Sequence, residues 1–174
     1  MANRAVFCIA KSELQAIDIV DGLKASGFSS GDVSVLFPDK GATRDFAHEQ
    51  KTKAPEGAAA GAGTGGVLGG ALGWLAGVGS LAIPGLGPFI AAGPIMGALS
   101  GAAAGAAVGG LAGALIGLGI PEHEAKLYEG KVAGGNILIS VHTEDRAERQ
   151  RAKEVFEEAG AEHVATKEEA SVSA

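Results

Sequence analysis

The side chains best suited to chemistry are four histidines and one cysteine, and their spacing decides whether they can act together. The histidines are His48, His123, His142 and His163. Structural zinc sites draw on pairs of ligands a few residues apart, and no two of these histidines are spaced in that way. Cys8 stands within the apolar run from Ala5 to Ala10, and no histidine or acid can be assigned to it as a base. We therefore expect no metal site and no catalytic residue, and we interpret Cys8 as a small buried hydrophobe.

A glycine-rich run from Gly57 to Gly66 invites comparison with phosphate-binding loops. A P-loop ends in Lys followed by Ser or Thr, because these side chains contact the phosphates and Mg²⁺, and this run has no such ending. The net charge of −6, with a pI near 5.2, comes without the clustered Lys and Arg that neutralise nucleic-acid phosphates. We predict a protein that is not an enzyme, with no cofactor, no nucleic-acid partner and no small-molecule substrate.

Two charged flanks have to carry any folded domain. In the first flank, Ala5 to Ala10 predicts a strand, and Val33 to Phe37 predicts a second strand that stops at Pro38. Between them, Ser12 and Gln15 form a capping box that opens a helix, and Gly27 ends it. The apolar positions expected to recur on this helix are Leu14, Ile17, Val20 and Leu23.

The last flank repeats this order of elements. Pro121 to Val132 predicts a helix with proline at its first position and Gly134-Gly135 as its terminator. Asn136 to Thr143 predicts a strand, and His163 to Thr166 predicts a short final strand. Asp145 to Ala159 predicts a charged amphipathic helix that ends at Gly160. Its expected apolar positions are Ala147, Ala152, Val155, Phe156 and Ala159.

Two strand–helix–strand halves separated by an insertion predict an α+β fold. We expect a ferredoxin-like domain, βαβ followed by (α)βαβ, interrupted by a long glycine-zipper helical hairpin. Residues 1–56 would supply the first half and a linker, 57–120 the hairpin, and 121–174 a helix and the second half, with a polar tail over 168–174. If the halves pair, both ends of the insertion return to the same side, so the insertion has to be a hairpin.

The insertion is marked by glycine at every fourth position. It holds 21 of the 29 glycines, and no Asp, Glu, Lys, Arg or His occurs from Gly57 to Ile120. The two glycine rows are Gly57, Gly61, Gly65, Gly69, Gly73 and Gly77, then Gly93, Gly97, Gly101, Gly105, Gly109, Gly113 and Gly117. On a helix such a row forms a groove into which another backbone packs closely. We predict two helices, Gly57 to Leu81 and Pro94 to Leu118, that pack together and drive homo-oligomerisation.

A lipid membrane is the expected environment of this hairpin. Each helix of about 25 residues would span roughly 37 Å, enough for a hydrocarbon core of about 30 Å. Glycine costs about 1 kcal/mol per residue relative to alanine in a helix in water, so the helices need support that a bilayer supplies. The turn between them is expected at Pro84, Gly85, Gly87 and Pro88, with Pro94 opening the second helix. Few strongly apolar side chains make insertion marginal, so reversible, shallow attachment is an alternative to spanning.

Three stretches carry a resemblance to a known family: Thr52 to Gly57, Ala82 to Pro94, and Gly119 to Gly130. In these stretches the chain resembles the bacterial general stress or low-temperature-induced proteins with a heat-induced-stress-type α/β domain. The resemblance covers nearly the whole chain and implies a bacterial, membrane-associated stress protein without an assigned enzymatic activity. The layout is also similar to the small subunit of alternative complex III, whose α/β domain carries a two-helix membrane anchor.

Four hypotheses for function follow. The leading one is a non-enzymatic stress-response protein at the cytoplasmic membrane that self-associates through its glycine rows and presents its α/β domain to the cytoplasm. A second is an accessory, membrane-anchored subunit of a quinol-oxidising respiratory complex. A third is a soluble ligand-binding or enzymatic module, which would need a polar constellation that the sequence does not display. A fourth is a pore-forming or membrane-coating assembly.

Overall fold

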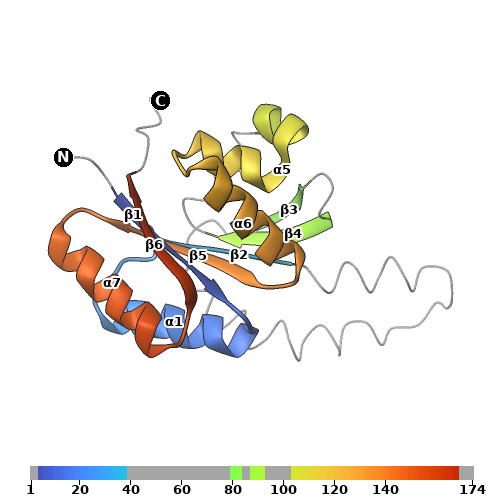
Figure 1. Ribbon diagram of the computed structural model, residues 1–174. Coiled ribbons are helices and arrows are strands. Elements are labelled where there is room, and N and C mark those ends of the chain that lie inside the picture. The colour runs from blue at the N-terminus through green and yellow to red at the C-terminus, as the bar shows by residue number, and fades with distance from the viewer. Residues whose placement is uncertain (1–3, 39–78, 84–86, 93–102, 169–174) are drawn as a thin grey trace, which may run out of the picture.

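The structure is a computed structural model that describes residues 4–38, 79–83, 87–92 and 103–168. Along the chain the described elements are β1 (Arg4–Ala10), α1 (Glu13–Ala25), β2 (Val33–Pro38), β3 (Gly79–Ile83), β4 (Gly87–Ala92), α5 (Ala103–Gly117), α6 (Glu122–Ala133), β5 (Ile137–Thr143), α7 (Arg146–Glu158) and β6 (Glu162–Glu168). The fold is therefore mixed α/β, with four helices among the described residues (Figure 1).

The strands form one antiparallel sheet in the order β3-β4-β2-β5-β1-β6. Four of them, β2, β5, β1 and β6, come from the two charged flanks. Among these four, β1 pairs with β5 from Arg4 opposite Thr143 to Ala10 opposite Ile137. The other two strands, β3 and β4, come from the uncharged insertion and extend the sheet at β2.

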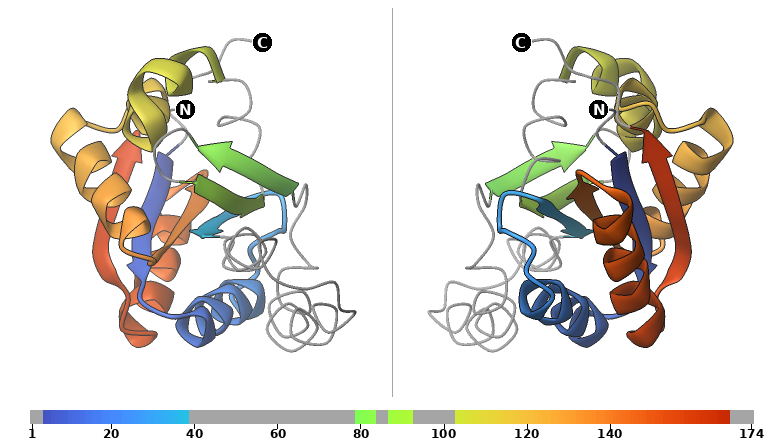
Figure 2. Two further views of the ribbon diagram at one scale, coloured as in Figure 1. Left: turned by 90° about the vertical axis from the view of Figure 1, so that its right-hand side faces the viewer. Right: turned by 90° about the vertical axis from the view of Figure 1, so that its left-hand side faces the viewer.

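Both faces of the sheet are covered by helices, as Figure 2 shows from two sides. On one face, α1 and α7 pack over side chains that alternate along the strands, such as Val6, Cys8, Val35 and Ile139. On the other face, α5 and α6 pack over the intervening side chains. Because both faces are buried, the central strands are apolar at almost every position instead of alternating with polar residues.

The helices and strands predicted in the two flanks are confirmed, except that Ala147 of the expected α7 stripe is exposed and that Glu168, assigned to the polar tail, ends strand β6. The N–H of Gln15 donates to Ser12 Oγ (3.2 Å), and the Gln15 side chain accepts from the N–H of Lys11 (2.7 Å). These two hydrogen bonds cap the N-terminus of α1. Gly27 and Gly160 have φ angles of +88° and +70°, the left-handed conformation expected where the two helices end. Pro121, expected at the first position of its helix, lies one residue before it, because α6 begins at Glu122.

The apolar stripe expected on α1 is wrong in part. The buried positions are Ala16, Ile19, Val20 and Leu23. Leu14 is 71% exposed, because it lies at the start of the helix and on the side away from the sheet. The neighbouring helix α7 lies closest to α1 at Gly22, where an added Cβ would come within 2.9 Å of Val155 Cγ1.

The insertion differs from the predicted hairpin in its middle. The helix expected to reach Leu81 is wrong at its end, because Gly79–Ile83 is strand β3. The turn expected at Gly87 and Pro88 is wrong as well, because these residues begin strand β4. Pairing with β4 satisfies the backbone groups along the outer side of β2, where Val35 lies opposite Ala92. The middle of the insertion is therefore part of the sheet. Pro84, Gly85 and Pro94 lie outside the described residues.

Candidate functional site

The predicted helix-packing glycines are described only in part. Gly105, Gly109, Gly113 and Gly117 lie in α5, on the same face of the sheet as α6. The remaining members of the two rows, Gly57, Gly61, Gly65, Gly69, Gly73, Gly77, Gly93, Gly97 and Gly101, lie outside the described residues. The packing of α5 is therefore the part of the predicted site whose geometry is known.

The α5 helix is broken at Gly110. This residue has φ 57° and ψ −150°, which is not a helical conformation, so the single helix expected from Pro94 to Leu118 is wrong at this point. The break frees backbone N–H groups that an unbroken helix would bond internally. One of them is satisfied by α6, because the N–H of Ala112 donates to Glu129 Oε1 (3.2 Å). A carboxylate near the start of the second helical piece also interacts favourably with its dipole.

Past the break, α5 is anchored in the core of the domain. Leu111 and Leu115 are fully buried, and Ala112 and Ala114 are nearly so. They belong to the cluster on this face of the sheet that includes Phe7, Leu138 and Tyr128. This piece of the glycine-rich insertion is therefore an integral part of the α/β domain.

The same helix pair also presents apolar residues outward. Ile116 on α5 is 43% exposed and Leu127 on α6 is 39% exposed. A Cβ added at Gly117 would meet no atom within 4 Å, so this glycine contacts nothing closely among the described residues. The row of glycines therefore does not serve as a packing groove within the domain at this position.

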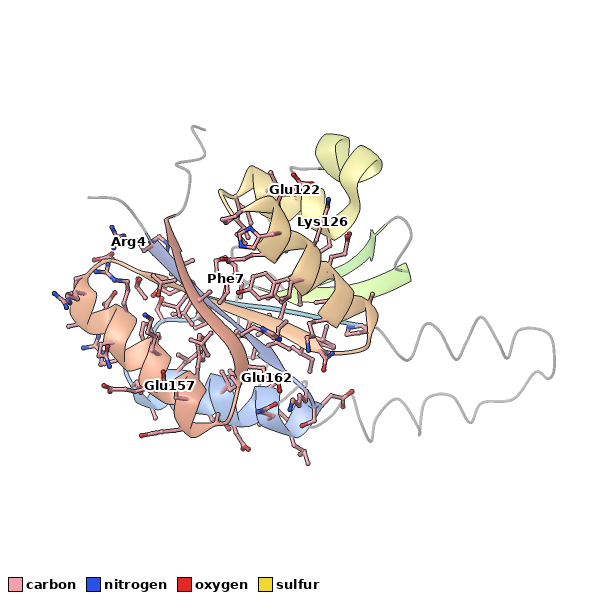
Figure 3. All side chains as sticks on the ribbon, in the orientation of Figure 1. Arg4, Phe7, Glu122, Lys126, Glu157 and Glu162 are labelled. Atoms are coloured by element: carbon pink, nitrogen blue, oxygen red, sulfur yellow. The ribbon has the colours of Figure 1, made fainter. Side chains whose placement is uncertain are left out.

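Tyr128 ties α6 to two strands. Its ring lies 6.0 Å from that of Phe7, which Figure 3 shows beneath α6, and its hydroxyl donates to the backbone carbonyl of His163 (3.2 Å). His163 has φ +52°, and the pairing of β1 with β6 shifts register between Phe7 and Ile9. Burial raises the pKa of Tyr128, and the nearby Glu124 adds to this effect. The phenol is therefore a neutral hydrogen-bond donor that holds an irregular part of β6.

The charged groups of the domain form exposed ion pairs. Lys11 Nζ lies 2.7 Å from Glu162 Oε1, and Lys131 Nζ lies 3.8 Å from Glu162 Oε2. The hydrogen bond from Lys11 lowers the pKa of Glu162. On α6, Lys126 lowers the pKa of Glu122 in the same way (Figure 3). Exposed pairs of this kind are worth little to stability.

Cys8 is buried, as predicted, and burial raises the pKa of its thiol far above the ordinary value. A thiol in this state is not a nucleophile at neutral pH. Over the described ranges, no group of three or more His, Cys, Asp or Glu side chains could hold a metal ion. In the part of the chain that the structure describes, the contribution of the insertion to the α/β domain is the packing of α5 and the backbone hydrogen bonds of β3 and β4.

Two residues of this site were not anticipated from the sequence, Gly110 and Glu129. The doublet Gly109-Gly110 was a usable signal, because the second glycine falls off the four-residue row and paired glycines often mark a break. No signal of this kind exists for Glu129, since its role depends on how α6 lies against α5.

Compared with protein families, curated proteins and solved structures, the chain shows no match. The fold and the site define an α/β protein in which an uncharged insertion supplies two strands and a helix to the domain that carries it. Within the described ranges, no helix combines the length and the apolar character needed to cross a bilayer.

Gly110→Ala is expected to lower the free energy of unfolding by about 1–3 kcal/mol, because φ 57° with ψ −150° is a conformation that residues with a Cβ rarely adopt. Gly117→Ala is the matched control on the same helix, with open space for the added methyl group and no expected loss. Urea denaturation followed by circular dichroism measures both. Equal stabilities for the two variants would mean that α5 is not broken at Gly110.

Proposed function

We propose that this protein is a non-enzymatic, membrane-associated bacterial stress-response protein that self-associates through its glycine rows and presents its α/β domain to the cytoplasm. The observation that carries the proposal is how the insertion joins the domain. The chain leaves the sheet after β2 and returns through α6 to β5, and these strands are antiparallel neighbours, with Leu36 opposite Leu138. The insertion is therefore held between neighbouring strands of one sheet, so a single folded domain carries the segment from 57 to 78.

The finer fold belongs to the same proposal. The order β2-β5-β1-β6, with α1 and α7 on a common face, supports a ferredoxin-like pairing of two βαβ halves. In that arrangement β3, β4 and α5 are additions that the insertion makes to the domain. The resemblance to bacterial general stress proteins supports the cellular role.

The geometry of the sheet limits how the protein attaches to lipid. Residues 57–78 hold no charged side chain, and at 1.5 Å per residue their 22 residues would span about 33 Å as a helix. A single crossing would put β2 and β3 on opposite sides of the bilayer, yet both strands belong to one sheet. We therefore propose that this segment enters and leaves the membrane on the same side, as a shallow attachment.

Self-association is assigned to the row from Gly57 to Gly77. The glycines of α5 between Gly109 and Gly117 are divided by the break at Gly110 and lie on a helix already packed against the sheet. A groove that supports helix association needs an uninterrupted row, which the first half of the insertion has in its sequence.

The test is flotation of the full-length protein with vesicles of bacterial phospholipids, followed by sizing in mild detergent. We expect the protein to float and to be oligomeric. Gly69→Leu with Gly73→Leu fills the row and should reduce the oligomer to a monomer or dimer. Val67→Leu with Ala71→Leu adds bulk to the opposite side of the same helix and should leave the size unchanged.

Quantitative recovery of the wild-type protein as a soluble monomer would overturn the proposal. An unchanged oligomer in the Gly69→Leu, Gly73→Leu variant would refute the role of the glycine row alone. Purification from native membranes gives a further outcome, because co-purified haem and iron–sulfur subunits would replace self-association with a place in a respiratory complex.

A further inference from the structure

The two outer strands of the sheet differ in how they are protected. Among the described residues, β3 and β6 are the outermost strands, and the outer side of such a strand offers unpaired N–H and C=O groups to another chain. Native proteins block unwanted pairing with charged side chains and with bulges. One of these two strands has both devices and the other has neither.

The β6 strand is protected. Its sequence, EHVATKE, carries four ionisable residues, and its pairing with β1 is irregular where His163 has φ +52°. If two copies paired through β6 about a two-fold axis at Ala165, Glu162 of each copy would lie opposite Glu168 of the other. Like charges directly opposite each other destabilise strand pairs, so this edge disfavours a second copy.

The β3 strand has none of these features. Its five residues, GSLAI, include no charge and no proline. Its register with β4 runs without a shift from Gly79 opposite Ala91 to Ile83 opposite Gly87. We propose that β3 pairs antiparallel with β3 of a second copy and so joins two sheets into one. Because the strand is uncharged, it meets no like charge when it pairs with itself.

Pro88 indicates which backbone groups of β3 are available for this pairing. Ala82 lies opposite Pro88, which has no N–H and is therefore placed best at a position where the two strands exchange no hydrogen bonds. Bonded positions alternate along an antiparallel pair, so Ser80 and Ala82 direct their N–H and C=O groups away from β4. In a two-fold pair centred on Leu81, Ser80 of each copy exchanges two hydrogen bonds with Ala82 of the other.

This register makes a sharp prediction for disulfide trapping. Leu81 of the two copies would form a pair without hydrogen bonds, whose Cα atoms are about 4.5 Å apart, a separation that a disulfide can bridge. Under mild oxidation the full-length Leu81→Cys protein is expected to become mostly covalent dimer. Ile83→Cys is the matched control, because position 83 faces Gly79 of the other copy and should stay monomeric on a non-reducing gel. The native Cys8 is buried and adds no background.

Hydrogen exchange gives an independent measurement on the unmodified chain. Protection of the Ser80 and Ala82 amides should rise with protein concentration and fall at least tenfold on dilution to the monomer. Protection that is independent of concentration would mean that the chain covers its own edge, and would overturn the proposal. Equal trapping of Leu81→Cys and Ile83→Cys, or none, would also overturn it.

The Leu81→Cys cross-link also distinguishes pairing through β3 from association through the glycine rows. In the Gly69→Leu, Gly73→Leu background the Leu81→Cys cross-link should form as efficiently as in the native background, because the sheet edge is unaltered. Loss of the cross-link in that background would mean that contact at β3 only follows from association through the glycines, and β3 would not be an interface of its own.

Discussion

Tyr128→Ala is expected to lower the free energy of unfolding by about 3–5 kcal/mol, the range for removing a large buried aromatic side chain. The tyrosine is 1% exposed, its ring packs near Phe7, and its hydroxyl holds the carbonyl of His163. The substitution therefore weakens the attachment of α6 to β1 and β6 at once. Urea denaturation of the full-length protein, followed by far-ultraviolet circular dichroism, gives the magnitude.

Tyr128→Phe separates the two contributions. It keeps the ring and removes one hydrogen bond, for which we expect a loss of about 1 kcal/mol. Amide exchange at β6 should increase in both variants, because the irregular strand around His163 loses its support. A loss below 1 kcal/mol for Tyr128→Ala would contradict the packing of α6 against the sheet.

Leu115→Ala is expected to cost about 2–5 kcal/mol, because the side chain is fully buried between α5 and the second face of the sheet. Ile116→Ala, at the next position of the same helix, removes a side chain that is 43% exposed and should cost much less. Thermal unfolding of the two variants measures the difference directly.

This comparison also tests where the last part of the insertion resides. If residues 103–117 were a membrane helix separate from the domain, as the sequence predicted, Leu115→Ala would leave unfolding of the α/β domain unchanged. A large loss with Leu115→Ala and a small one with Ile116→Ala is the result expected for a helix that belongs to the domain core.

The elements of the flanks were predictable from local chemistry. Ser12, Gln15, Gly27 and Gly160 act within one or two helical turns, so their roles are encoded in short stretches of sequence. The strands β1, β2 and β5 were recognised from continuous apolar runs. An apolar run without alternating polar residues also indicates a strand that is buried on both faces, and this would have predicted helices on both sides of the sheet.

The place of α5 in the second layer of helices was missed, because a membrane explained the same apolar residues. Leu111 and Leu115 on a glycine-rich helix are equally suited to lipid and to a protein core, and composition does not distinguish the two. The burial of Leu14 was also predicted wrongly. Two overlapping sets of positions on α1 form apolar stripes of similar quality, and only packing against the sheet decides which set is buried.

The strands β3 and β4 were misread for a different reason. Residues 79–83 and 87–92 are short apolar runs, for which periodicity does not separate helix from strand. Their conformation depends on the outer side of β2, which is distant in sequence. The roles of the glycines that lie outside the described residues, and the association assigned to them, stay predictions.

The pairing of β1 with β5 sets the order in which this protein can fold during synthesis. Thr143 Oγ1 donates to the carbonyl of Arg4 across 139 positions, so the centre of the sheet cannot close until nearly the whole chain has left the ribosome. At translation rates of about 5–20 residues per second, the 23 residues from Ile120 to Thr143 take about 1–5 seconds to synthesise, so the uncharged stretch is made at least that long before β5 is complete. Any binding of the nascent uncharged stretch to a chaperone or a bilayer would therefore come before the sheet closes.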